Sequence, residues 1–297
     1  AADGEDTAEQ ELPIDEAHFP DANFREYIKD KIDLDGNGSL SQEEIIAVEE
    51  ISLSSTNGKV FSDVSGVEYF INLKEFSCFD CQLTSLDLSK NLKLERLVCS
   101  KNQLTNLDVS QNLELDTLQA WGNRLTSLDV SNNRKLRFLV CGKNPLAKLD
   151  VSNLTSLELL DCGECRLTNL NLDNNKELIE LDCAGNQLVS LDIRNTALYA
   201  LWCADNQLRN LQTNSKLIYL ECDGNTLSNL DLTNETKMTM RDDEKKGGGV
   251  AHHGELAGAY VTPQTLSRTV KSVNGVWTLD MASIVGKSYL DRVTLAT

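Results

Sequence analysis

A repeat of 21 residues fills most of this 297-residue chain and limits its folding more than any other feature. The pattern Leu-x-x-Leu-x-Cys-x-x-Asn-x-Leu recurs, as in LERLVCSKNQL (94–104) and LIELDCAGNQL (178–188). Its sixth position is taken in turn by Cys78, Cys99, Ala120, Cys141, Cys162, Cys183, Cys203 and Cys222, with steps of 21 residues five times and then 20 and 19. A fixed period of this length predicts a solenoid, in which each repeat buries its apolar face only against its neighbours.

The spacing inside one repeat predicts a parallel sheet. Leu160 and Cys162 lie two positions apart, so on a strand both point into the solenoid and Asp161 points outward. The second half of the repeat, LTSLDVSNN (125–133), supplies Leu128 and Val130 for the opposite wall and has no helical period. We therefore expect a parallel sheet on the concave side and an extended or irregular convex side.

Over residues 45–240 this skeleton resembles the leucine-rich repeat family. The resemblance implies that an asparagine column after the strands satisfies buried backbone groups of adjacent turns. That column consists of Asn102, Asn123, Asn144, Asn186, Asn206 and Asn225. The fold class expected from residues and resemblance together is an α/β repeat solenoid with a helical N-terminal cap and a small β-rich C-terminal segment.

The nine cysteines all fall in the strand column or the asparagine column. Two C-x-x-C pairs result, Cys78 with Cys81 and Cys162 with Cys165. This spacing can also indicate a redox dithiol or half of a zinc site. The pairs are four repeats apart, which at about 4.8 Å per strand is roughly 19 Å and too far to share one zinc ion. We predict nine reduced, buried structural thiols.

Before the repeats, residues 33–44 read DLDGNGSLSQEE and match the twelve-residue EF-hand calcium loop. Gly38 stands where that loop needs its sharp turn. The ligands expected from the spacing are Asp33, Asp35, Asn37, Ser39 through its carbonyl, Ser41 through water, and Glu44 through both carboxylate oxygens. We predict one structural Ca²⁺ here; the alternative is a solvated turn between two helices.

The flanks of this loop predict helices. DANFREYIKDKI (21–32) places Phe24, Tyr27 and Ile28 at helical spacing after a potential N-cap, Asp21. SQEEIIAVEEI (41–51) begins the second helix and runs into the first strand. A single EF-hand lacks its usual partner, so we expect this module to cap the open end of the repeat core.

The chain is therefore divided as follows. We expect a disordered acidic lead-in at 1–17, an EF-hand-like helical cap at 18–50, a solenoid at 51–240, a linker at 241–258 and a β-rich segment at 259–297. The natural chain is expected to continue past Thr297.

The segment at 18–44 with GVEYFINL (66–73) resembles the N-terminal module of secreted leucine-rich repeat proteins of Gram-positive gut bacteria. GVEYFINL is also similar to the first repeat of internalin-like adhesins. The resemblance implies a binding protein that is secreted or displayed on the cell surface, without naming its ligand.

Charge and composition exclude several functions. With 28 basic and 46 acidic residues the net charge is −18, which disfavours nucleic acid as a partner. No apolar run is long enough to span a membrane. A Cys–His nucleophile would need His18, His252 or His253 beside an accessible cysteine, and no cysteine follows Cys222. We predict no enzymatic activity.

The predicted function is binding through outward positions of the concave sheet, whose residues the core does not dictate. Apolar side chains nevertheless gather there, and such patches usually mark interaction sites. The expected partner-binding residues are Val98, Trp121, Phe138, Val140, Leu159, Trp202 and Tyr219. The acidic residues around the last two, which favour a basic or polar partner, are Asp161, Glu180, Asp182, Glu221 and Asp223.

Two readings of this surface stay open. The aromatic residues could instead pack on one another, and the chain could be a spacer that holds another domain away from the cell. The partner could be a protein or a polysaccharide, and we expect the chain itself to be a monomer.

Overall fold

The computed structural model describes residues 11–55, 59–217, 219–227, 229–231, 258–260, 270–273 and 276–280. Most of the expected lead-in, the expected linker and most of the expected C-terminal segment lie outside these ranges, as do His252 and His253. The chain divides into two compact units, Ala1–Lys135 and Leu136–Thr297, here called unit 1 and unit 2. In the described part of the chain, every helix is too short or too polar to cross a bilayer.

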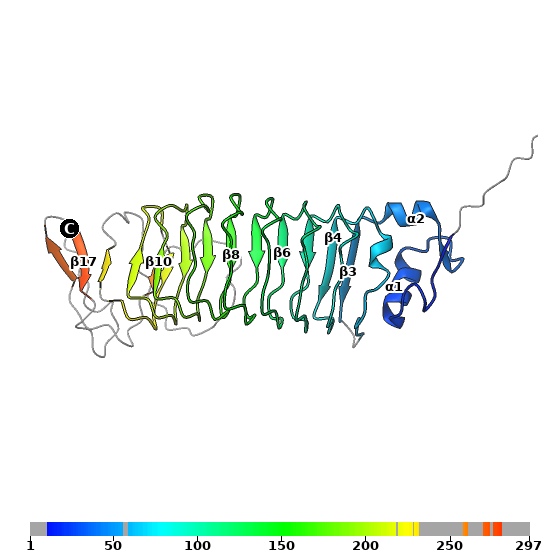
Figure 1. Cartoon of the computed structure of the whole chain (residues 1–297), viewed down its shortest axis with the longest axis horizontal. Helices are drawn as coiled ribbons and strands as arrows, with labels where there is room; N and C mark the ends of the chain where they lie inside the picture. The colour runs from blue at the N-terminus through cyan, green and yellow to red at the C-terminus, as the bar shows by residue number, and fades with distance from the viewer. Residues whose placement is uncertain are drawn as a thin grey trace, which may run out of the picture. The chain divides into compact units, whose positions relative to one another are not determined.

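Unit 1 begins with short helices and continues into parallel strands (Figure 1). Its elements are β1 (Leu12–Pro13), α1 (Ala22–Lys31), β2 (Ser39–Leu40), α2 (Gln42–Ala47), β3 (Glu50–Ser54), the 3₁₀ turn η2 (Val67–Tyr69), β4 (Glu75–Phe79), β5 (Arg96–Val98) and β6 (Thr117–Gln119). The strands β3 to β6 pair in parallel in sequence order, which confirms the predicted sheet.

Helix α1 forms where the sequence predicts it. The Asp21 side chain accepts a hydrogen bond from the Phe24 amide and caps the first turn. Phe24 and Ile28, one helical turn apart, are fully buried. The Phe24 ring packs edge-on against Phe19, which stacks on Phe70 of the first repeat. This aromatic cluster joins the helix to the start of the repeats.

Unit 2 continues the parallel stacking. Its elements are β7 (Phe138–Val140), β8 (Leu159–Asp161), β9 (Glu180–Asp182), β10 (Ser190–Asp192), β11 (Ala200–Trp202), β12 (Asn210–Gln212), β13 (Tyr219–Glu221), β14 (Asn229–Asp231), β15 (Gly258–Tyr260), β16 (Val270–Val273) and β17 (Val276–Asp280). The main sheet runs β7-β8-β9-β11-β13 and continues to β15.

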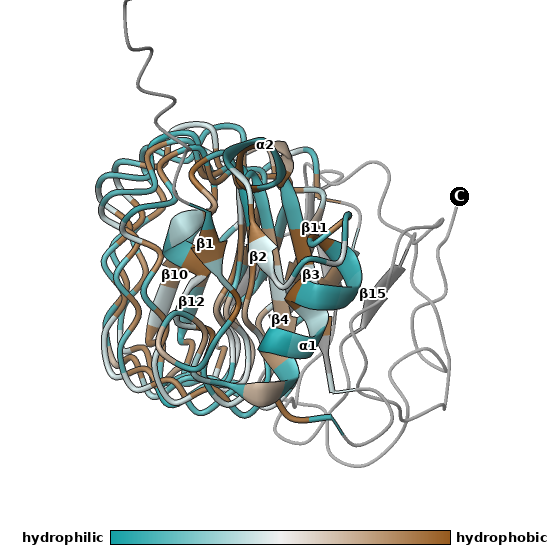
Figure 2. Cartoon of the chain, turned by 90° about the vertical axis from the view of Figure 1, so that its right-hand side faces the viewer, coloured by the Kyte–Doolittle hydropathy of each residue, from teal (hydrophilic) through white to brown (hydrophobic). Residues whose placement is uncertain are grey.

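Two smaller sheets complete unit 2. Strands β10 and β12 pair in parallel on the other side of the turns from β11 (Figure 2). Strands β14, β17 and β16 pair antiparallel. No helix occurs among the described residues of unit 2, so the convex side is extended, as its lack of helical period predicts.

The solenoid interior is lined by the cysteine column and the leucines of each repeat. Every member of that column, Ala120 included, is at most 2% exposed. All nine cysteines are free and buried, which confirms the prediction of shielded thiols. Burial disfavours the thiolate and raises the pKa of Cys99 and of Cys222 to about 12. Such thiols are poor nucleophiles and behave as small apolar residues.

The asparagine column closes the turn after each strand. The Asn102 side chain donates to the carbonyls of Cys78 and Cys99 at 2.8 and 3.0 Å, and its oxygen accepts from the amides of Cys81 and Leu83. One buried side chain therefore pairs backbone groups of two successive turns, as the leucine-rich repeat resemblance implies. Where Cys165 replaces asparagine, its thiol donates to the Cys141 carbonyl at 3.3 Å.

Candidate functional sites

The predicted calcium loop folds around the Asp33 side chain. This carboxylate is 8% exposed and accepts hydrogen bonds from the amides of Gly36, Asn37 and Gly38 at 2.8 to 3.2 Å. Gly38 has a φ of +85°, a conformation that disfavours other residues, so the turn glycine is required where the motif places it. Strand β2 lies within the loop and pairs antiparallel with β1, which ties the loop to the segment before α1.

Three of the six predicted ligands come together in this loop. Oxygen atoms of Asp33, Asp35 and Glu44 all lie within 4.8 Å of one another. The Asn37 side chain lies beside Asp35, with its nitrogen 3.0 Å from a carboxylate oxygen of that residue. Ser41 is placed next to Glu44, to which its hydroxyl donates at 3.0 Å. The carbonyl contribution expected of Ser39 stays a prediction.

Glu44 is held in its ionised form although it is partly buried. Burial disfavours the charge, but the amides of Ser41 and Leu34 donate to its two oxygens at 2.9 and 2.7 Å, and the balance lowers the pKa of Glu44 below its usual value. The same residue and Ser41 form the capping box of α2. The donor set fits Ca²⁺, a hard cation that prefers carboxylate and carbonyl oxygens.

The predicted binding residues divide between the two units. In unit 1, Val98 is half-buried on β5, in register with Ser77 of β4 and Gln119 of β6. Trp121, also half-buried, lies two residues beyond the end of β6 and thus in a different row from Val98. Its carbonyl accepts the Lys101 amide at 2.8 Å.

Unit 2 carries the other five predicted residues on its outward sheet face, defined here as the outward positions of β7, β8, β9, β11 and β13. Phe138 is in register with Leu159, and both are half-buried, as is Val140. The Arg137 guanidinium lies 5.0 Å from the Phe138 ring centroid and is paired with Glu158 at 2.9 Å. This end of the face is therefore apolar with a neutralised ion pair at its margin.

Further along, Trp202 and Tyr219 form an aromatic pair with ring centroids 4.9 Å apart. Trp202 is half-buried, whereas Tyr219 is only 7% exposed. Tyr219 was predicted as an outward contact residue; its ring instead packs beside Trp202 and its hydroxyl donates to Glu221 at 3.0 Å. The accessible surface of the pair belongs mainly to Trp202.

Carboxylates occupy the row that contains Trp202. Asp161 pairs in register with Asp182, and Trp202 lies in register between Asp182 and Glu221. Burial and the nearby Asp182 charge raise the pKa of Asp161 to about 6. Burial likewise raises the pKa of Asp182 and of Glu221. These side chains are poorly hydrated acids, which makes the face an acidic one.

His18, the one described histidine, lies in the N-terminal segment and contacts Asp15 at 2.7 Å. It also lies against Tyr69, with 6.1 Å between the ring centroids. Cys78, the cysteine nearest to His18 in sequence, is buried. These contacts are those of a surface hydrogen bond and give no nucleophile for His18 to activate.

Comparison with known proteins gives matches among solved structures only. No family model and no curated protein matches the chain. The functional domain of InlJ from Listeria monocytogenes matches with a TM-score of 0.68 and 30% identity, over 78% of this chain and 56% of that one. A leucine-rich repeat protein of Leptospira interrogans, LIC12759, matches with 0.56 and 24%, over 63% and 52%. Internalin C2 of L. monocytogenes matches with 0.55 and 21%, over 74% and 90%. The chain has an internalin-like leucine-rich repeat fold.

This internalin-like chain spans little more than half the length of the InlJ and LIC12759 chains it matches. The InlJ domain is described as including a cysteine ladder. The present solenoid also stacks cysteines, since seven of the eight positions in its inward column are cysteine and Ala120 is the eighth. The column is a property of the buried core.

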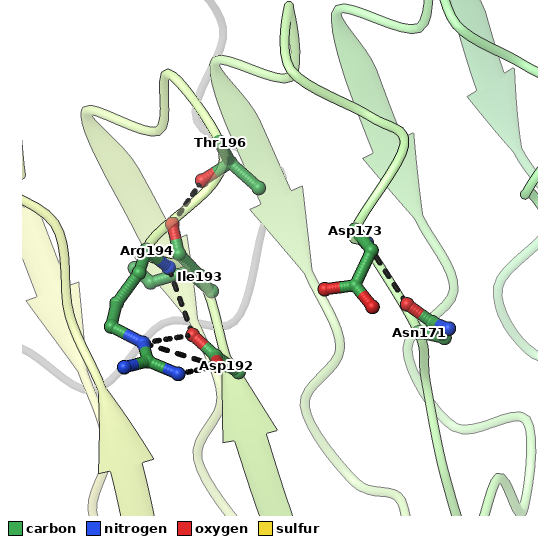
Figure 3. Close-up of polar contacts among 6 residues, drawn as sticks. All are labelled: Asn171, Asp173, Asp192, Ile193, Arg194 and Thr196. Atoms are coloured by element: carbon green, nitrogen blue, oxygen red, sulfur yellow. Dashed lines mark hydrogen bonds and ion pairs between the residues drawn. The ribbon is translucent and has the colours of Figure 1, made fainter.

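Two further columns of this internalin-like fold were missed by sequence reasoning. Buried asparagines on the convex side, such as Asn112 and Asn133, donate to carbonyls of the preceding turn at 2.9 to 3.0 Å. Before them, a side-chain oxygen accepts the amide two residues later, as Asn171 does from Asp173 and Asp192 from Arg194 (Figure 3). Both columns repeat with the same period, in segments such as LDVSNN, and that was the available signal.

Proposed function

We propose that this chain is a non-enzymatic extracellular binding protein that recognises a macromolecular ligand through its outward sheet face. The observation that carries the proposal is the cluster of half-buried Phe138, Leu159 and Val140 on the adjacent strands β7 and β8, where the core demands no apolar residue. Structural similarity to leucine-rich repeat interaction proteins supports a protein ligand, with a polysaccharide as the alternative.

The proposal extends to location and assembly. We propose a protein that is secreted or displayed on the surface of a Gram-positive bacterium, acts in adhesion and is a monomer. The internalin-like fold and its similarity to the InlJ domain support this. A charge of −18 also favours a chain that repels its own copies in solution.

A binding screen tests the function. Protein and glycan arrays would be probed with the wild type, with the double variant Phe138→Ala/Trp202→Ala and with Leu113→Ala, a control whose side chain is 53% exposed in a turn outside the sheet. We expect a ligand that the wild type and the control bind and the double variant loses. Equal binding by all three would contradict the proposal and favour the spacer alternative.

We further propose that Asp33, Asp35, Asn37, Ser39, Ser41 and Glu44 hold one structural Ca²⁺. The proximity of three carboxylates supports the proposal, because like charges this close repel each other unless a cation lies between them. The bound ion would offset two of these three negative charges and fix the loop between α1 and α2. We expect weak to moderate affinity, suited to the millimolar calcium of an extracellular medium.

A further inference from the structure

Trp202 lies between two carboxylates on the outward sheet face of unit 2. Strand β11 pairs with β9 on one side and β13 on the other, which places Asp182 and Glu221 on either side of Trp202 in one row. The indole is supported by Tyr219, whose ring is tilted by 42° to it at 4.9 Å. The Tyr219 hydroxyl bonds Glu221 at 3.0 Å and fixes that carboxylate beside the aromatic pair.

Among the described residues, Asp182 and Glu221 have no cation of their own. Residues 180–187, 200–207 and 219–227 contain no lysine or arginine. Within the described ranges, no ion pair reaches Asp182 or Glu221. Burial raises the pKa of both, so their ionised forms have lost part of their hydration. A cation supplied from outside would therefore gain more here than at an exposed carboxylate.

The row next to these carboxylates carries mostly small side chains. After the strands, the positions beside Asp161, Asp182 and Trp202 are taken by the small residues Gly163, Ala184 and Ala204, and the position beside Glu221 is taken by Asp223, a further acid. The amide of Glu164 donates to the Ala184 carbonyl and that of Gly185 to the Ala204 carbonyl, so these small residues stack in register. No bulky side chain among them covers the carboxylates from that side.

We infer that Trp202, Asp182 and Glu221 bind an arginine side chain from a basic segment of a protein partner. A guanidinium can stack on the indole face while its in-plane N–H groups donate to a carboxylate at each side. Lysine offers a point charge without the planar fork, and a neutral polar group would leave the two acids unpaired. The inference rests on the proposed function of the outward sheet face and names the chemistry of its partner.

Titration of the full chain with two synthetic peptides tests this inference. The probes are an acetylated, amidated peptide of alternating alanine and arginine, and the same peptide with citrulline, which keeps the shape of arginine without its charge. We expect the arginine peptide to bind and the citrulline peptide to bind at least about tenfold more weakly, a difference of 1.4 kcal/mol. Asp182→Asn and Glu221→Gln, which keep the side-chain shape, should each weaken the arginine peptide by a similar factor.

Asp173→Asn is the matched control, because it removes the same charge from an exposed turn outside the sheet. Circular dichroism of each variant would verify the fold. Absence of arginine-peptide binding, equal binding of the citrulline peptide, or unchanged binding by both sheet-face variants would overturn the inference. If the array ligand still depends on Trp202 in that case, the binding face stands and only its arginine partner is wrong. If the array ligand is also indifferent to Trp202, the proposed function fails as well.

Discussion

At the scale of single residues, Asp161 is the described carboxylic acid whose pKa is raised furthest above its ordinary value. Its pKa is raised to about 6 by burial first and by Asp182 second. The folded state then binds a proton more tightly than the unfolded state does. The resulting stability is full below the unfolded pKa of about 4 and is lost as pH rises through about 6.

Asp161→Asn should therefore raise the melting temperature most above pH 6 and hardly at pH 3.5. The amide can still accept the Gly163 N–H that the carboxylate accepts at 3.1 Å. Asp129→Asn is a control of opposite sign, since hydrogen bonds from Ser131 lower the pKa of Asp129. The stability that these hydrogen bonds contribute is present above the unfolded pKa of Asp129 and is lost as pH falls below it. Thermal melts between pH 3.5 and 8 measure both; a pH-independent effect of Asp161→Asn would contradict the account.

At the scale of structural elements, the asparagine column should contribute measurably to stability. Asn123 is 8% exposed, donates to the carbonyls of Cys99 and Ala120 and accepts from the Leu104 amide at 3.1 Å. Asn123→Ala leaves these buried groups unpaired and should lower the free energy of unfolding by about 1–3 kcal/mol. Urea denaturation measures it. Asn132→Ala, in an exposed position, should cost far less, and equal losses would show that burial of the column is not what matters.

The calcium loop is the other element with a testable role. Calcium should raise the melting temperature of the wild type, since the folded loop binds the ion and the unfolded chain does not. Glu44→Gln removes one carboxylate yet keeps a side chain able to cap α2, so we expect most of this calcium response to be lost. Glu43→Gln, the same change one residue earlier, should keep it. Calorimetric titration with calcium and thermal melts of all three proteins would reject the site if none responds or all respond equally.

Elements of this chain are predictable from sequence to different degrees. The inward rows follow from spacing, because Leu160 and Cys162 have no other way to be buried on a strand. Helix α1 follows from its Asp21 cap and its apolar spacing. Outward positions follow less well, because accessibility depends on neighbours from other turns. Tyr219 is buried beside Trp202, and Trp121 lies beyond its strand, and neither fact can be read from one repeat alone.

At the scale of the whole molecule, the repeats build the core from one face of the sheet, so the core does not dictate which residues lie on the other face. The leucines, cysteines and asparagines of each repeat satisfy the interior, and they recur in both units. The residues that differ between repeats lie on the outward side of the strands. In unit 2 they change from apolar at Phe138 and Leu159 to acidic and aromatic around Trp202. A ligand that contacts both ends would need apolar and basic groups a few strands apart.

Covalent side-chain footprinting with the ligand found by the array screen tests the central claim most directly. Carbene labelling in the presence and absence of ligand reports which side chains become covered. The account predicts protection of Phe138, Leu159 and Trp202 on the outward sheet face, with no change at Leu92 and Leu113, which are 56% and 53% exposed outside it. Protection of Leu92 and Leu113 with unchanged labelling of Trp202 and Phe138 would contradict it.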